Sequence, residues 1–247
     1  MKEKEVLLII DPQNDFVTPG GSLFIPEADS NVTKICELIE TRNPSKIIIT
    51  QDTHQAYHIG HSCWWKENPA PFTQITYDDV IKGTYSPRIS SNKRELVSYL
   101  NRLPGKVHTI WPEHCLEGSW GWALPNKLIK ALSTWQLKNQ GRKYEIIQKG
   151  TSQNHEMYSA ITRADNTSIK ILKYNTFIKK LTSYDKVLVT GFAKDVCVAW
   201  TVKDLHDSKY FKDKLVFIDS CMGCLDTEAE TLKIYDTAVK EGGAVWE

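Results

Sequence analysis

The chain has 247 residues, of which 31 are Lys or Arg and 30 are Asp or Glu, so its formal net charge at pH 7 is +1. This near balance excludes a global electrostatic field that would recruit nucleic acid or an acidic membrane surface, and it favours a small-molecule partner. The apolar stretch after "MKEKE" ends at Asp11, which is too short for a signal peptide or a membrane span. We therefore expect a cytoplasmic protein whose six sparsely placed cysteines stay reduced.

Short apolar runs and helical patterns alternate along the chain. The runs predicted as strands are 6–10, 46–50, 107–111, 144–148, 186–190 and 214–218. The segments with helical periodicity are 31–42, 92–103, 123–135, 168–181, 195–206 and 227–241. Near-continuous apolar strands separated by helices indicate a parallel sheet that is covered on both faces. The pattern predicts one doubly wound α/β domain over 1–247, with three αβα layers and a central, mostly parallel, six-stranded sheet.

The stretch 63–105 is the least regular part of the chain. It contains "KENPAPF" and "GTYSPRISS", which fit neither a strand nor a helix. We expect it to be an elaboration of the sheet that shapes a pocket mouth or an oligomer contact. Whether the protein is a homo-oligomer is left open.

Three side chains of the types used in covalent catalysis follow separate predicted strands. Asp11 ends the first run, Lys149 follows the fourth, and Cys197 follows the fifth, in the first turn of a predicted helix. Ligands of open parallel sheets bind beyond the carboxyl ends of the strands, so we expect these groups at one edge. A helix start and a nearby ammonium would stabilise a thiolate at Cys197, and a carboxylate would accept its proton. The alternative is that Cys197 is a buried structural cysteine.

A second group has the residue types of a metal site. Asp52 and His54 are two residues apart after the second run, and in an extended chain such side chains point the same way. His114, in "WPEHC" after the third run, adds a ligand from a distant segment, as an open catalytic metal site requires. One carboxylate and two imidazoles suit Zn²⁺, Fe²⁺ or Mn²⁺ without singling one out. The alternative is a hydrogen-bonded surface cluster.

Five longer stretches, spread along nearly the whole chain, carry a resemblance to a known family. They are "LLIIDPQNDFVTPGGSL", "TQDTH", "HTIWPEHCLEGSWGWAL", "IIQKGTSQNHEMYSA" and "VTGFAKDVCVAWTVKDL". With them the chain resembles the nicotinamidase branch of the isochorismatase-like hydrolases. The resemblance implies one divalent transition metal ion, with zinc the first expectation. It assigns two residue sets: a catalytic triad of Asp11, Lys149 and Cys197, and the metal ligands Asp52, His54 and His114.

The resemblance also implies how the substrate is held. A cis peptide bond is expected between Phe192 and Ala193, so that the backbone N–H groups of Ala193 and Cys197 form an oxyanion hole. The metal is expected to bind the pyridine nitrogen of the substrate. Our candidates for the pocket wall are Phe16, Trp111 and Tyr158.

The implied reaction is hydrolysis of nicotinamide, or of a close aromatic carboxamide, to nicotinate and ammonia through a thioester on Cys197, as in NAD salvage. One alternative is a related hydrolase of another amide, a ureido compound or a vinyl ether. Another is a metal- or ligand-binding protein without catalysis. The stretch "DTHQAYHIGHSCWW" departs from the family pattern, so a fourth protein ligand could be His58, His61 or neither. The long segment 63–105 leaves the exact substrate open.

Overall fold

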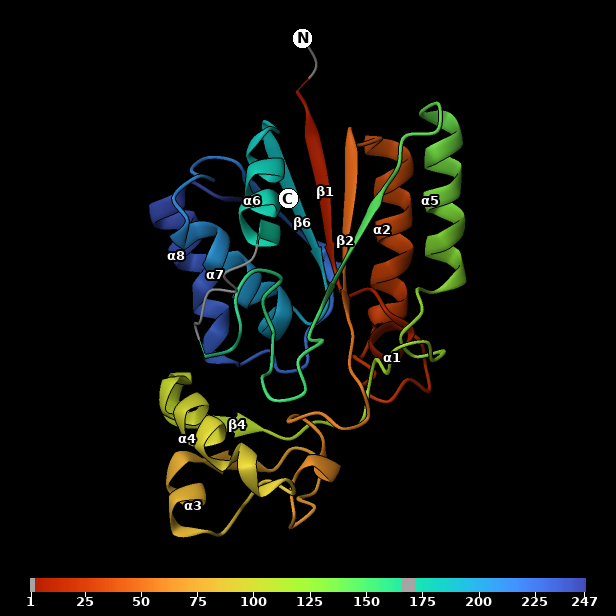
Figure 1. Cartoon of the computed structure of the whole chain (residues 1–247). Coiled ribbons are helices and arrows are strands. Elements are labelled where there is room, and N and C mark those ends of the chain that lie inside the picture. The colour runs from red at the N-terminus through yellow and green to blue at the C-terminus, as the bar shows by residue number, and fades with distance from the viewer. Residues whose placement is uncertain (1–2, 166–171) are drawn as a thin grey trace.

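A parallel sheet forms the centre of the computed structural model, which describes residues 3–165 and 172–247 (Figure 1). In these residues the sheet has six strands in the order β5-β2-β1-β6-β7-β8, and each neighbouring pair is parallel. This confirms the predicted doubly wound α/β fold. The strands are β1 (Glu5–Ile10), β2 (Lys46–Asp52), β5 (Glu145–Lys149), β6 (Lys186–Gly191), β7 (Leu215–Met222) and β8 (Val245–Trp246).

Helices cover both faces of the sheet because its inner strands are apolar on both sides (Figure 1). In β1, Leu7 and Ile9 pack toward one helical layer, whereas Val6 and Leu8 pack toward the other. The predicted helix over 168–181 corresponds to α6, and its residues 168–171 lie outside the described residues. The first layer contains α1 (Asn14–Val17), α2 (Ala28–Arg42) and α5 (Asn126–Lys138), and the second contains α6 (Leu172–Thr182), α7 (Ala199–Asp207) and α8 (Lys233–Gly242).

One predicted strand belongs to a different sheet. The run 107–111 contains β4 (Val107–Thr109), which pairs antiparallel with β3 (Gln74–Thr76) in a separate two-stranded sheet. Along β4 the burial alternates, with His108 buried between two half-buried neighbours, which is typical of a strand with one covered face, whereas the inner strands of the main sheet are apolar on both faces. The sixth strand of the main sheet is instead β8, which has only two residues and was not predicted.

Residues 59–110, which we call the cap, form a region beyond the carboxyl ends of the main strands (Figure 1). The cap is larger and more regular than the predicted elaboration at 63–105. It contains β3, β4, α3 (Tyr77–Lys82), α4 (Lys93–Arg102) and short 3₁₀ turns at Ser62–Trp64, Ser90–Asn92 and Pro104–Lys106. Its hydrophobic residues form a cluster separate from the two layers of the main sheet: Ile59, Trp64, Trp65, Ile75, Val80, Leu96, Tyr99, Leu100, Leu103 and Ile110.

The order of the strands creates a crevice between β1 and β6. The chain runs outward from β1 through β2 to β5 and then returns to β6 on the other side of β1. Where the winding direction reverses in this way, the loops leave the two strand ends in opposite directions, and ligands bind between them. Asp11 follows β1 and Cys197 follows β6, so both lie at this reversal.

Two further observations bear on the environment of the protein. All six cysteines lie among the described residues, and all are free thiols. In the parts of the chain that the structure describes, no helix has the length and apolar character needed to cross a bilayer.

Candidate active site

The three predicted catalytic side chains meet at the crevice between β1 and β6. The Nζ atom of Lys149 lies 2.9 Å from Oδ2 of Asp11 and 3.6 Å from Sγ of Cys197. It also donates a hydrogen bond of 3.0 Å to the carbonyl oxygen of Met157. All three side chains are buried. The structure therefore brings together an acid, an ammonium and a thiol that come from three different strand ends.

Cys197 lies in a π-helical turn, Lys194–Val198, that directly precedes α7. The turn is closed by a 3.1 Å hydrogen bond from the N–H of Val198 to the carbonyl of Ala193, and such turns are frequent at functional sites. The peptide bond between Phe192 and Ala193 is cis, which confirms this expectation. Within the described part of the chain, the N–H of Ala193 donates no backbone hydrogen bond, so it is free for a ligand.

Thr50 holds the Asp11 carboxylate in place, a role that sequence analysis missed. Its hydroxyl donates to Oδ1 of Asp11 at 2.6 Å and accepts the N–H of Asp11 at 3.0 Å. With Oδ1 occupied in this way, Oδ2 is the atom that faces Lys149. A threonine within the apolar run of β2 was the only signal in the sequence, because it is a buried hydroxyl that needs a partner.

Burial controls the protonation of Asp11, Lys149 and Cys197, which we call the catalytic group. Burial raises the pKa of the Cys197 thiol well above its ordinary value, and the favourable charge of Lys149 does not cancel the rise. Burial also raises the pKa of Asp11, against the opposing charge of Lys149. For Lys149, burial lowers the pKa, but Asp11 and Asp52 more than offset this and keep the ammonium charged. The expected resting thiolate is therefore not favoured, and the thiol keeps its proton until a base accepts it.

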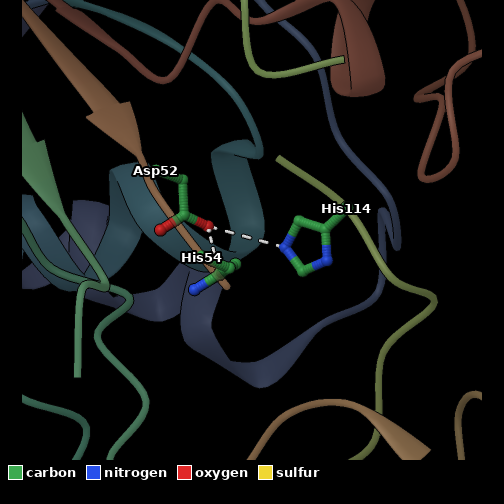
Figure 2. A group of neighbouring side chains, drawn as sticks. All are labelled: Asp52, His54 and His114. Carbon is green, nitrogen blue, oxygen red and sulfur yellow. Dashed lines mark ion pairs between the residues drawn. The ribbon is translucent and has the colours of Figure 1, made fainter. Parts of the chain in front are cut away.

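Asp52, His54 and His114, which we call the metal group, come together beside the catalytic group (Figure 2). Oδ2 of Asp52 lies 3.0 Å from Nε2 of His54 and 3.5 Å from Nε2 of His114. Each residue offers one ligand atom within 4.8 Å of the others, and all three residues are buried. Asp52 ends β2, whereas His114 arrives from the loop after β4 and not from a strand of the main sheet. The predicted metal ligands are thus brought together, although one comes from an element that was wrongly assigned to the sheet.

The donor set fits a divalent transition metal. The Nδ1 atoms of His54 and His114 lie 2.9 Å and 2.8 Å from the carbonyl oxygens of Gly150 and Pro112. A carbonyl can only accept, so Nδ1 carries a proton, and in the neutral ring Nε2 keeps the lone pair that would bind a metal. Burial raises the pKa of Asp52, but His54 and Lys149 outweigh this and hold it well below the ordinary value. A carboxylate and two imidazole lone pairs therefore converge, as in three-ligand catalytic metal sites.

Lys149 joins the two groups. Besides Asp11 and Cys197, its Nζ atom lies 3.1 Å from Oδ1 of Asp52. One buried ammonium therefore contacts a carboxylate of the catalytic group and a carboxylate of the metal group. Because an unpaired buried charge is costly, we expect each carboxylate to depend on this lysine.

Glu156 and two further histidines surround the metal group. The ring of His54 lies 4.1 Å from that of His58 and 5.5 Å from that of His61, measured between centroids. Glu156 was not predicted, and its Oε2 lies 4.0 Å from Nδ1 of His58. Burial raises the pKa of Glu156, but the charges of His58 and His54 outweigh this and bring it to about 2. The site therefore holds a third buried carboxylate, besides those of Asp11 and Asp52.

A pocket opens onto both groups. Its empty space, including the mouth, is about 370 Å³. The three predicted wall residues, Phe16, Trp111 and Tyr158, all line the pocket. The indole N–H of Trp111 donates a 3.2 Å hydrogen bond to the hydroxyl of Tyr158. The ring centroid of Phe16 lies 5.4 Å from that of His114. Apolar walls with a few convergent polar groups are typical of small-molecule sites. The lining residues that sequence analysis did not predict are Leu23, Glu156, Val196 and Leu225.

Comparison with curated proteins finds nicotinamidases, although no family model matches the chain. The chain is 32% identical to the nicotinamidase of Acinetobacter baylyi over 216 residues, which cover 87% of this chain and 79% of that protein. It is 28% identical to the nicotinamidase of Saccharomyces cerevisiae over 203 residues, which cover 80% of this chain and 79% of the relative.

Comparison with solved structures finds the same fold. A nicotinamidase and pyrazinamidase of Acinetobacter baumanii matches with a TM-score of 0.70 at 24% identity, over 100% of this chain and 96% of that one. The pyrazinamidase of Pyrococcus horikoshii, solved in complex with zinc, matches with a TM-score of 0.58 at 19% identity, over 99% of this chain and 98% of that one. At these identities the structural matches establish a shared fold.

Proposed function

The chain belongs to the nicotinamidase family, and on this premise we propose that it hydrolyses nicotinamide to nicotinate and ammonia. The observation that carries the proposal is the buried contact of Lys149 with both Asp11 and Cys197 at a pocket that also exposes the metal group. This arrangement pairs a nucleophile with a base and with a charge that keeps the base ionised.

The reaction follows from the positions of these residues. Oδ2 of Asp11 accepts the proton of the Cys197 thiol, and the sulfur attacks the carboxamide carbon. The N–H groups of Ala193 and Cys197 stabilise the negative oxygen, by about 3 kcal/mol per donor in comparable sites. Asp11 then returns the proton to the amide nitrogen, the C–N bond breaks, and ammonia leaves a thioester on Cys197.

The second half of the reaction restores the enzyme. Asp11 accepts a proton from a water molecule, whose oxygen attacks the thioester carbon. The C–S bond breaks, the proton on Asp11 passes to the sulfur, and the acid that is released loses its proton to solvent and becomes nicotinate. Throughout, the charge of Lys149 offsets the carboxylate charge on Asp11, which is otherwise costly in a buried site.

We propose that Asp52, His54 and His114 hold one divalent metal ion, with zinc favoured and iron or manganese as alternatives. When bound, the ion supplies a Lewis-acidic position for the pyridine nitrogen of the substrate, which orients the carboxamide toward Cys197. The proposed enzyme acts in the cytoplasm as part of NAD salvage, which accords with its free cysteines and balanced charge.

The test is ammonia release from nicotinamide, pyrazinamide and benzamide by the purified protein. Benzamide has the same outline as nicotinamide but lacks the ring nitrogen. A site built around a polar contact rejects the analogue that lacks it, by factors of about 10⁴ in favourable cases. We expect nicotinamide and pyrazinamide to be hydrolysed and benzamide to react far more slowly. Rapid cleavage of benzamide with inert nicotinamide would overturn the proposed substrate.

A further inference from the structure

Phe72 occupies a backbone position in the cap that a large side chain rarely takes. Its φ angle is 68°, in the left-handed region that favours glycine. The residue follows Pro71 in a turn that is closed by a 3.1 Å hydrogen bond from the N–H of Thr73 to the carbonyl of Ala70. A turn with proline second and a positive φ third normally has glycine or asparagine at the third position. Phenylalanine at this position therefore costs stability that glycine would not.

The Phe72 ring recovers little of this cost by burial. It is 59% exposed, and it does not belong to the hydrophobic cluster of the cap. It contacts the indole of Trp111 edge-to-face, with ring centroids 6.1 Å apart and ring planes at 83°. Trp111 in turn lines the pocket. A strained residue whose exposed ring touches a pocket wall points to a role in function, because strain of this kind gathers at functional sites.

The backbone sets Phe72 and Trp111 side by side. β3 and β4 pair antiparallel, and two hydrogen bonds continue this pairing to the turn. The N–H of Phe72 donates to the carbonyl of Ile110 at 2.5 Å, and the N–H of Ile110 donates to the carbonyl of Thr73 at 2.9 Å. Continued in this way, the register places Phe72 opposite Trp111, where the side chains of paired strands meet. One residue thus serves a turn that prefers glycine and a cross-strand contact that needs a ring.

Trp111 is held at its backbone and at two points of its ring. Its backbone N–H donates to the carbonyl of Gly60 at 2.7 Å, which fixes the main chain. Its indole N–H donates to the hydroxyl of Tyr158 at 3.2 Å, which fixes one point of the ring. The contact with Phe72 supplies the second point. Without Phe72 the indole would be free to turn about its hydrogen bond to Tyr158, and the pocket would widen on the side of the cap.

We propose that Phe72 is a positioning residue that controls substrate choice, because it fixes the indole of Trp111 and with it the width of the pocket. The inference rests on the proposed function, and it names a residue of the cap that limits which aromatic carboxamides enter. Removal of the ring should admit nicotinamides that carry an additional methyl group on the pyridine ring. An edge-to-face pair of rings is worth a factor of about 2–10 in an equilibrium constant, which sets the size of the expected effects.

The test compares Phe72→Gly with Phe72→Ala, which both remove the ring but differ in backbone strain. Ammonia release is measured from nicotinamide and from its 2-, 4-, 5- and 6-methyl derivatives. In both variants we expect kcat/KM for at least one methyl derivative to rise by about 3- to 10-fold relative to that for nicotinamide, with a larger change in KM than in kcat. Phe72→Tyr keeps a ring and should keep the selectivity of the parent. Unchanged selectivity in both Phe72→Gly and Phe72→Ala would overturn the proposal.

Thermal unfolding separates this role from a role in stability. At a positive φ glycine is less strained than alanine, so Phe72→Gly should unfold at a higher temperature than Phe72→Ala. Gln140→Gly is the matched backbone control, because Gln140 is exposed, has a φ of 56° and lies outside the pocket lining. It should raise the unfolding temperature and leave selectivity unchanged. If the more stable Phe72→Gly regained the selectivity of the parent while Phe72→Ala did not, Phe72 would be a structural residue and the proposal would fail.

A further measurement requires no turnover. Exchange of the Trp111 indole proton with solvent is followed by NMR, with the resonance assigned by Trp111→Phe. It should be about 3- to 10-fold faster in Phe72→Ala than in the parent, and unchanged in Gln140→Gly. Faster exchange in a protein that leaves nicotinamide intact would refute the proposed amidase and support the role of Phe72 in holding Trp111. Unchanged exchange in Phe72→Ala would overturn the inference itself.

Discussion

The catalytic group and the metal group are adjacent, yet the protein builds them in different ways. Asp11 and Lys149 sit at the carboxyl ends of two parallel strands, and Cys197 sits in the turn after a third. His54 and His114 lie in loops between the main sheet and the cap, and these loops pair with each other. The N–H of His54 donates to the carbonyl of Cys115 at 3.0 Å, and the carbonyl of His54 accepts the N–H of Glu117 at 2.9 Å. Strand register fixes the first group, and contact between two loops fixes the second.

This difference predicts that the two groups can be disabled separately. A parallel sheet holds its strand ends rigidly, so the chemistry depends on a few atoms at fixed positions. The loop pair, in contrast, can lose a metal ligand while the sheet beneath it stays folded. Lys149, which contacts Asp11, Cys197 and Asp52, is the exception that belongs to both groups.

The largest expected effect is loss of the nucleophile. We expect Cys197→Ala to lower kcat by at least about 10⁴-fold, because members of a catalytic unit act together and the loss of one removes most of the benefit. Zn²⁺ binding should be unchanged, as measured by equilibrium dialysis. Cys36→Ala is the matched control, because Cys36 lies on α2, outside the pocket lining, and should keep full activity. Turnover by Cys197→Ala near that of the parent would end the covalent mechanism.

Removal of a proposed metal ligand should act on substrate choice more than on the thiol. We expect His54→Ala to lose more than about 100-fold in Zn²⁺ affinity, since even supporting residues cost 10- to 100-fold. The preference for nicotinamide over benzamide should then collapse toward 1, as the kcat/KM ratio would show. Iodoacetamide should still label Cys197 at close to the parent rate. A variant that keeps both its metal and its preference would show that His54 is not a ligand.

The cap offers a test of whether the chain unfolds as a unit. Trp65 is 0% exposed in the cap cluster, and its indole N–H donates to the carbonyl of Ile59 at 2.8 Å. Truncation of a buried tryptophan typically costs about 3–5 kcal/mol, so Trp65→Ala should lower the urea midpoint strongly. If residues 1–247 form one domain as predicted, a single transition should remain for fluorescence and circular dichroism alike.

Trp120→Ala is the control for that measurement. Trp120 is 56% exposed, and a surface substitution of this kind should change the free energy of unfolding by no more than about 0.5 kcal/mol. Two separate transitions in Trp65→Ala, with the second at the midpoint of the parent, would show that the cap unfolds independently of the sheet.

What the sequence could predict follows the same division between strands and loops. The ends of β1 and β6 were predictable because buried parallel strands are near-continuous apolar runs, and Asp11 directly follows such a run. β5 is a half-exposed edge strand, and only its apolar pair Ile146 and Ile147 before Lys149 indicated it. The metal residues were recognisable by type and spacing, but their meeting point depends on the pairing of two loops, which no periodicity reports. The antiparallel pairing of β4 was missed for that reason, and so was the two-residue β8, which is too short to carry a pattern.

The protonation state of the Cys197 thiol also could not be predicted from the sequence. A helix start beside a lysine predicts a thiolate, but burial of Cys197 outweighs the charge of Lys149 and raises the pKa of the thiol. The depth of a side chain depends on everything that packs over it, including the loop of Leu225 and the walls of the pocket. Thr50 was likewise present in the sequence, but only its hydrogen bond to Asp11 shows what it holds.

The smallest expected effect concerns Asp195, which couples the nucleophile turn to a wall of the pocket. Asp195 is buried, and its two carboxylate oxygens accept the N–H groups of Leu225 and Asp226, each at 2.9 Å. Leu225 lines the pocket that Cys197 also lines. The carboxylate therefore fixes the distance between this wall and the turn that carries the thiol.

Asp195→Asn should loosen that wall and leave the thiol in place. The amide keeps one acceptor oxygen but turns an NH₂ group toward the second backbone N–H, so one hydrogen bond is lost, at a cost of about 0.5–1.5 kcal/mol. Because about 1.4 kcal/mol corresponds to tenfold in affinity, we expect KM for nicotinamide to rise by roughly 3- to 10-fold. Both kcat and the rate of Cys197 alkylation should stay within about twofold of the parent, since the lost bond touches the wall and not the reacting atoms.

Asp226→Asn is the control, because the Asp226 side chain accepts only from the N–H of Glu228 among the described residues, and it should leave KM unchanged. A fall in kcat at constant KM would instead mean that Asp195 acts on the turn that carries Cys197. In that case the catalytic residues positioned by strands would not be independent of the pocket wall positioned by loops.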